Sequence, residues 1–193
     1  MGYLKQAWLV IVLALVFGAA LAAVQAALDQ RIEDNKLAKS FAVVPSLVAG
    51  AEGGKTKPLQ VAGQTVYRAV DKDGKLVGWV VKASGQGFAD VIQLLIGLDP
   101  KAQTVTGLFV LGQLETPGLG NRIEGGSWRA QFRGKSTASP LAAVKTTPDG
   151  NQVQAVTGAT ISSESVCAIV NEAVAKVHKE LAERASSERI EQP

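Results

Sequence analysis

The sequence VQAVTGATISSESVCAIVNEAVAKV, residues 153–177, predicts a short strand, a tight turn and a helix in direct succession. The strand is the short stretch VQAV at 153–156, and the turn is Thr157-Gly158-Ala159-Thr160. Apolar residues then recur at spacings of three and four, which is typical of a helix with one buried face. These residues are Val166, Ile169, Val170, Ala173, Val174, Val177 and Leu181.

The junction between strand and helix has the chemistry of an anion site. The first turn of a helix leaves backbone N–H groups unpaired, and the helix dipole favours negative charge there. Gly158 and Ala159 leave room for a bulky group to approach. Thr160 or Ser162 can instead act only as a helix cap, and this plainer interpretation stays open at this point.

Upstream of this junction, the sequence favours antiparallel strands. Residues 65–70 and 76–83 are β-branched and aromatic runs, and the DG-containing turn at 71–75 between them predicts a hairpin. Residues 104–112 and 141–147 predict further strands. Strands combined with few helices predict an α+β domain, which we place at 59–185.

Between these strands lies a segment that predicts irregular structure. Residues 115–126 contain four glycines and predict a loop without regular elements. Trp128 and Phe132 follow four residues apart, which predicts a short helix that packs both rings inward.

The N-terminal part differs in composition from the rest. Residues 7–24, AWLVIVLALVFGAALAAV, carry no charged or polar side chain, and as a helix they reach roughly 27 Å, close to the thickness of a bilayer core. We therefore assign 1–28 to a transmembrane anchor and 29–58 to a stalk and linker, in which Pro45 is expected to interrupt any long helix. The tail 186–193 is polar and is expected to fray.

Two properties of this anchor have alternatives. A signal peptide cleaved near Val24-Gln25-Ala26 competes with an uncleaved anchor, although the apolar run is longer than a usual signal core. Basic residues are more numerous after the span than before it, which by itself favours a cytoplasmic domain. Large domains translocate largely regardless of such charges, so we expect the domain on the outer face of the cytoplasmic membrane.

Charge and composition exclude several classes of function. The net charge is only +3, without a basic cluster interleaved with aromatic residues, so no nucleic-acid partner is expected. Cys167 is the only cysteine and His178 the only histidine, so no internal disulfide, zinc site or Ser/His/Asp triad is expected.

Three blocks of sequence carry a resemblance to a known family. They are the VTGATISS block at 156–163, the ETPGLG block at 115–120 followed by Trp128, Phe132, Gly134 and Lys135, and the GQGF block at 85–88 followed by IGLD at 96–99. In this order the chain resembles the FMN-binding domain family, in particular the G subunits of Rnf-type ion-translocating electron-transport complexes. The C subunits of sodium-translocating NADH:quinone reductases are similar too.

The resemblance implies a covalent cofactor. In this family the last Thr of the TGAT motif carries FMN through a phosphoester, and this position is Thr160 here. Thr157, Gly158, Ala159 and Ser162 are then expected to surround the phosphate. A threonine hydroxyl is a weak nucleophile without a base, so the bond is not expected to form unaided. The resemblance implies a separate flavin transferase that uses FAD and a divalent metal. One position departs from the family pattern, because Gln154 stands where Asp is usual.

Four further residues are expected near the flavin ring. The resemblance implies that Thr116 and Leu119 shape the ring pocket and that Phe88 stacks on the isoalloxazine. Lys145 is expected to pair with the phosphate or the ring edge. The plainer alternatives are core packing for Phe88 and a solvated surface position for Lys145.

The predicted function is therefore that of an electron carrier. The resemblance implies one subunit of a membrane-bound translocase, with the other subunits of that complex as partners. Two alternatives stay open, a stand-alone membrane-anchored flavoprotein for extracellular electron transfer and a binding module whose TGAT motif is unmodified. Covalent flavin separates the last from the other two.

Overall fold

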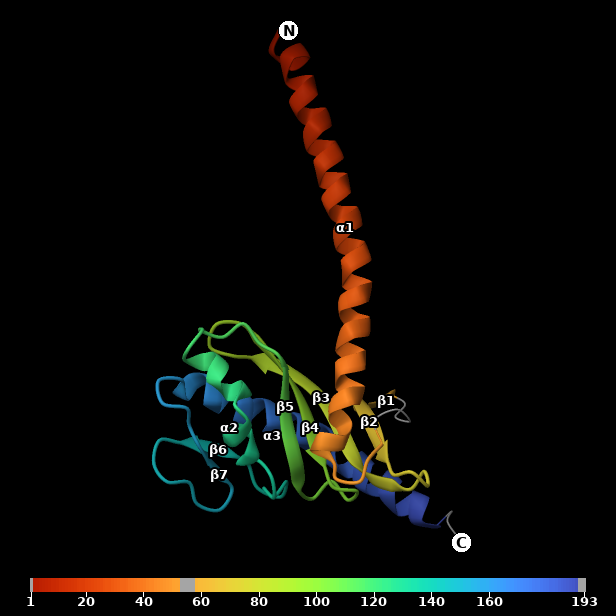
Figure 1. Ribbon diagram of the computed structural model, residues 1–193. Coiled ribbons are helices and arrows are strands. Elements are labelled where there is room, and N and C mark those ends of the chain that lie inside the picture. Colours follow the sequence, from red (N-terminus) through yellow and green to blue (C-terminus); the bar gives the residue numbers. More distant parts are fainter. Residues whose placement is uncertain (1, 53–57, 191–193) are drawn as a thin grey trace. The chain divides into compact units, whose positions relative to one another are not determined.

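A computed structural model describes residues 2–52 and 58–190 (Figure 1). The chain divides into two compact units, Met1–Lys39 and Ser40–Pro193. The first helix, α1, runs from Gly2 to Leu47, so its last turns belong to the second unit.

The first unit is helical and contains a long apolar segment. Within the described residues, one segment is long and apolar enough to cross a membrane, the 22 residues Ala7–Leu28. Length and composition are those of a bilayer-spanning helix, and a signal sequence shares both.

The prediction that Pro45 interrupts a long helix is wrong. Pro45 lies inside α1, which continues to Leu47. A proline lacks the N–H that would bond to the residue four positions earlier, so α1 forgoes one hydrogen bond at Pro45 and ends two residues later. The predicted linker 29–58 is also divided, because the globular unit begins at Ser40 rather than at residue 59.

The second unit is built on a five-stranded antiparallel sheet. The strands follow one another in space in the order of the sequence. They are β1 (Pro58–Val61), β2 (Gln64–Val70), β3 (Leu76–Gln86), β4 (Val91–Leu98) and β5 (Val105–Gly112). The predicted hairpin corresponds to β2 and β3, and Gly74 takes the positive φ of 83° that its turn requires. Asp71 stabilises this turn, because its Oδ1 accepts the N–H groups of Asp73 and Lys75, each at 2.9 Å.

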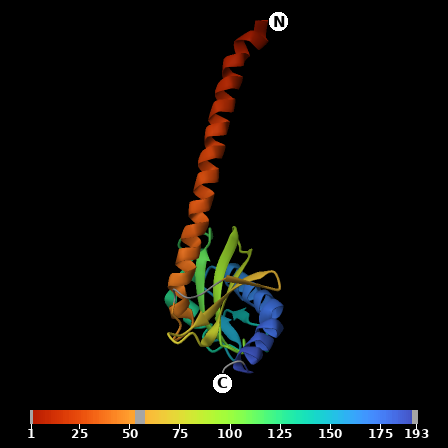
Figure 2. The same ribbon diagram turned by 90° about the vertical axis from the view of Figure 1, so that its right-hand side faces the viewer.

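Both faces of the sheet are buried. One face packs on α3 (Thr160–Ile190), and Trp79, Val81 and Ile96 belong to this core. The other face carries Val80 and Leu95, which form a second core with Val44 and Leu47 from the end of α1. Figure 2 shows the strands between α3 and the last turns of α1.

Glycines on the sheet make room for the end of α1. A Cβ on Gly97 would lie 2.8 Å from the carbonyl oxygen of Leu47, and one on Gly107 would lie 3.0 Å from Leu47 Cδ2. On β3, a Cβ on Gly78 would lie 2.7 Å from Val48 Cγ1. The backbone of the sheet therefore approaches Leu47 and Val48 more closely than any residue with a side chain would allow.

Short elements complete the domain. They are the 3₁₀ helix η1 (Gly120–Glu124), α2 (Gly126–Ala130), β6 (Ala142–Val144) and β7 (Gln152–Gln154). The predicted short helix is α2, and the rings of Trp128 and Phe132 pack edge to face with centroids 5.2 Å apart. The predicted α+β class is confirmed.

Three boundaries differ from the prediction. The expected strand 141–147 contains only the three residues of β6, which pair in parallel with β7. The expected irregular loop 115–126 includes η1. The expected frayed tail 186–193 is helical up to Ile190, and its last three residues lie outside the described part of the chain.

Candidate functional site

The TGAT turn joins β7 to α3 through an unusual backbone. Gly158 has a φ of +82°, and a Cβ at this position would lie 3.0 Å from Leu119 Cδ2. Only glycine adopts this φ without strain, so the turn requires the residue that the sequence supplies. The N–H of Ala159 donates to the carbonyl of Val156 at 2.9 Å and closes the turn.

Ser163 holds this turn against the helix, a role that the sequence interpretation missed. Its Oγ accepts the N–H of Val156 at 3.0 Å and donates to the carbonyl of Ala159 at 2.9 Å. Ser163 is fully buried. A hydroxyl at the fourth helical position, on the side of the apolar stripe, is the signal in the sequence that pointed to this role.

The first turn of α3 offers unpaired donors to a ligand. The N–H groups of Thr160, Ile161 and Ser162 have no backbone acceptor, and no side chain of the described residues bonds to them. They lie at the N-terminus of a 31-residue helix, whose dipole favours an anion at this end.

A cavity of about 220 Å³ opens beside this turn. Nine residues line it, namely Phe88, Thr116, Leu119, Gly120, Gly158, Ala159, Thr160, Ile161 and Ser162. Three segments that are distant in the sequence thus meet at one place: the loop before β4, the glycine-rich loop before η1, and the start of α3.

Most of the site residues expected from the sequence meet at this cavity. The sequence predicted nine site residues, and seven of these line the cavity, namely Phe88, Thr116, Leu119, Gly158, Ala159, Thr160 and Ser162. Thr157 is exposed on the turn and Lys145 is exposed just after β6, and neither lines the cavity. Gly120 and Ile161 line it without having been expected.

The glycine-rich loop is fixed to the other two segments by Glu115. This side chain is buried, and its Oε1 accepts the N–H of Ala89 at 3.0 Å. Its Oε2 accepts the hydroxyl of Ser162, which is also buried. The hydroxyl hydrogen of Ser162 is therefore not available to a ligand in the cavity, whereas the backbone N–H of the same residue is.

Comparison with known proteins identifies the domain. Residues 87–175 match the profile of the FMN-binding domain family, and this segment contains every residue that lines the cavity. The chain carries an FMN-binding domain. It is 40% identical over 108 residues to the G subunit of the ion-translocating oxidoreductase complex of Methanosarcina acetivorans. It is 36% identical over 118 residues to the G subunit of the proton-translocating ferredoxin:NAD(+) oxidoreductase complex of Clostridium ljungdahlii.

These similarities cover only part of each protein. They include 56% and 61% of this chain and 55% and 63% of the two relatives, so the chain spans little more than half of their length. The crystal structure of Shewanella oneidensis NqrC superposes with a TM-score of 0.56 and 23% identity. It covers 64% of this chain and 61% of NqrC, and it shows that the two share a fold.

The cavity of the FMN-binding domain suits the two ends of FMN. The N–H groups at the start of α3 suit the phosphate. Around the cavity, Phe88, Leu119 and Ile161 are 64%, 45% and 52% exposed, which is unusual for large apolar side chains but suits contact with a planar aromatic ring. A cavity of about 220 Å³ is smaller than a typical ligand pocket of about 300–1,000 Å³, so the ring would extend over its apolar rim.

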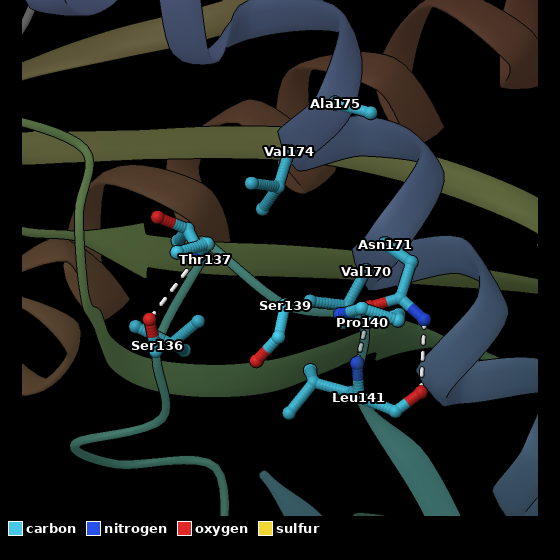
Figure 3. A pocket seen from close by; sticks show the side chains of 11 residues that line it. Ser136, Thr137, Ser139, Pro140, Leu141, Val170, Asn171, Val174 and Ala175 are labelled. Carbon is cyan, nitrogen blue, oxygen red and sulfur yellow. Dashed lines mark hydrogen bonds between the residues drawn. The ribbon is translucent and has the colours of Figure 1, made fainter.

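A second cavity, of about 290 Å³, lies between α3 and the loop 136–141 (Figure 3). Its main polar group is already paired, because Asn171 Oδ1 accepts the N–H of Leu141 at 2.8 Å and Asn171 Nδ2 donates to the Leu141 carbonyl at 2.9 Å. Figure 3 shows these two bonds side by side. The part of α3 that lines this cavity is Val170–Ala175, in the middle of the helix, so the N–H groups at the start of α3 do not face it.

No second redox group emerges from the described residues. Burial, with a smaller contribution from the charge of Glu164, raises the pKa of Cys167 to about 12, so its reactive thiolate is scarce at neutral pH. Among the residues that the structure describes, His, Cys, Asp and Glu form no cluster of three that could bind a metal ion. The match of residues 87–175 to the FMN-binding domain family is what supports FMN as the cofactor.

Proposed function

We propose that this protein is the electron-carrying flavoprotein subunit of a membrane-bound, Rnf-type ion-translocating complex, with FMN attached covalently to Thr160. One observation carries the proposal: Thr160 lines the cavity of an FMN-binding domain at the N-terminus of α3. When bound, FMN supplies one- and two-electron chemistry. The protein supplies the attachment hydroxyl, the anion-binding N–H groups and the apolar walls.

Thr160 is the best placed of the hydroxyls in the TGAT turn and the first turn of α3. Ser162 and Ser163 are buried and donate their hydrogens to Glu115 and Ala159, respectively. Thr157 is exposed but lies outside the cavity. Thr160 is half-buried, lines the cavity and has no side-chain hydrogen bond among the described residues.

Attachment requires a second protein. In the proposed reaction, Thr160 Oγ forms a bond to the phosphorus of the FMN half of FAD while the pyrophosphate bond breaks and AMP leaves. The hydroxyl proton passes to a base of the flavin transferase, because no histidine or carboxylate of the described chain lines the cavity. The product gains the mass of one FMN less one water.

The experiment that tests this function combines two measurements. The full chain is produced with a flavin transferase and run on a denaturing gel, where covalent flavin remains fluorescent. It is then purified from membranes under mild conditions. We expect large integral-membrane partners to accompany it, as for a translocase subunit that is not a complete enzyme alone. Fluorescence without such partners would instead favour a stand-alone flavoprotein, and a dark band would favour an unmodified module.

The membrane arrangement is a further part of the proposal. We expect an uncleaved anchor that includes Ala7–Leu28, with the FMN-binding domain on the outer face of the cytoplasmic membrane. A reporter fused after residue 193 should be active only on that side, and the mature protein should retain residues 1–28. A shortened, freely soluble product would show instead that the apolar run is a cleaved signal.

Leu119 is expected to form one wall of the ring pocket. Its side chain is partly exposed beside Gly158 and lines the cavity. Leu119→Ala should keep covalent FMN but admit water to one face of the ring, which changes its visible absorbance. The midpoint potential should shift by tens of millivolts, since a tenfold change in relative affinity of the two redox states corresponds to about 59 mV for one electron.

The matched control is Leu114→Ala. Leu114 is a more exposed leucine of the same segment and does not line the cavity, so its removal should leave both readings unchanged. If Leu119→Ala also gives the spectrum and potential of the parent, Leu119 is ordinary loop packing and the ring lies elsewhere.

A further inference from the structure

Glu115 occupies an unusual environment. Among the residues whose burial the structure describes, it is the only charged residue that is buried, with 4% of its surface exposed. No cationic side chain of the described residues forms an ion pair with it. Burying a carboxylate is costly unless hydrogen bonds compensate for the lost water, so Glu115 depends on its hydrogen-bond donors.

The hydrogen bonds of Glu115 join three segments of the site. Oε1 accepts the N–H of Ala89, the residue after Phe88, and Oε2 accepts the hydroxyl of Ser162 in the first turn of α3. The backbone of Glu115 belongs to the third segment, which carries Leu119. Each cavity wall therefore lies within a few residues, along the chain, of Glu115 itself or of a residue that is hydrogen-bonded to its carboxylate.

Two glycines allow this arrangement. A Cβ on Gly120 would lie 2.7 Å from Glu115 Cβ and 3.0 Å from Ser162 Oγ. A Cβ on Gly87 would overlap Glu115 Oε1. Gly87 and Gly120 therefore approach Glu115 so closely that a side chain at either position would collide with it.

We infer that Glu115 is a positioning residue of the flavin site. It sets the distance between the apolar walls at Phe88 and Leu119 and the phosphate end at Thr160. It also takes the hydroxyl hydrogen of Ser162, so that Ser162 offers a bound phosphate its backbone N–H alone. This inference rests on the proposed function, because it assigns a role toward the flavin.

The role requires a carboxylate rather than a polar side chain of the same size. Both oxygens of Glu115 accept hydrogen bonds, whereas glutamine has one acceptor and one donor. Glu115→Gln therefore either loses the bond from Ala89 or reverses the bond with Ser162. Reversal would free the Ser162 hydrogen to point into the cavity.

The test measures both the protein alone and the flavin. We would compare hydrogen exchange of the segment 86–95 in the full chain without flavin, and the visible circular dichroism of the full chain with flavin. In Glu115→Gln we expect exchange in this segment to rise about tenfold if the bond from Ala89 is lost, the effect of losing one hydrogen bond to a charged group, and to match the parent if the bond with Ser162 reverses instead. The visible circular dichroism should also change, although flavin stays on Thr160.

Ser162→Ala and Glu124→Gln complete the design. Ser162→Ala removes the second partner of Glu115 without adding a donor, so it should change the visible circular dichroism even if Glu115→Gln does not fold. Glu124→Gln makes the same charge change at an exposed glutamate of the segment 115–126. Its hydrogen exchange in 86–95 and its visible circular dichroism should both match the parent. If Glu115→Gln and Ser162→Ala also match the parent, Glu115 has no positioning role. A parent without flavin on Thr160 would overturn the proposed function, and the exchange measurement would still decide whether Glu115 holds the three segments together.

Discussion

Thr160→Ala is expected to remove all flavin fluorescence from the protein band of a denaturing gel. The substitution deletes the one cavity-lining hydroxyl of the TGAT turn that is not engaged in a hydrogen bond. Because the attachment is a single bond, its loss is complete rather than graded. The intact mass should fall from that of the flavinylated chain to that of the bare chain, apart from the small difference between Thr and Ala.

Two variants control this result. Thr160→Ser keeps a hydroxyl at the same place and should retain flavin, at least in part. Thr157→Ala removes a neighbouring hydroxyl that lies outside the cavity, and should leave labelling unchanged. Fluorescence that persists in Thr160→Ala, or that disappears in Thr157→Ala, would show that FMN is attached at another residue and would contradict our assignment.

Phe132→Ala is expected to lower the stability of the domain strongly. Phe132 is fully buried, and its ring packs against Trp128, whose Nε1 donates to the carbonyl of Gln154 at 2.8 Å. Truncation leaves a cavity where α2 supports β7, the strand that leads into the TGAT turn. Such substitutions cost about 3–5 kcal/mol, which lowers the melting temperature by roughly 10 °C for a chain of this length.

Thermal unfolding of the detergent-solubilised protein, followed by circular dichroism, measures this effect. Phe88→Ala removes the same atoms from a phenylalanine that is largely exposed, so without flavin it should melt close to the parent. A Phe132→Ala protein that melts within about 2 °C of the parent would show that α2 contributes little to the stability of the domain.

Local sequence signals predicted much of the fold. The hairpin of β2 and β3 follows from two β-branched runs and a turn containing Asp71 and Gly74, all within 23 residues. The helix α3 follows from its apolar stripe. In both cases the residues that determine the element are neighbours in the chain, so a single sequence is sufficient.

Long-range contacts could not be predicted in the same way. The sequence placed Phe88, Leu119 and Thr160 near one ligand only through family resemblance, and the structure brings them to one cavity. The bond between Glu115 and Ser162 joins residues 47 positions apart and has no periodic signal. The parallel pairing of β6 with β7 was missed because three-residue strands are too short to show a pattern.

The close contact of Leu47 with Gly97 and Gly107 limits where the chain can be truncated without exposing the core. A fragment that begins at residue 59, after the apparent linker, would lack the helical turns that cover Val80 and Leu95. Its sheet would present a bare apolar face to water, and such a face promotes aggregation. The last turns of α1 are part of the core of the second unit, so a truncated protein should begin no later than Ser40.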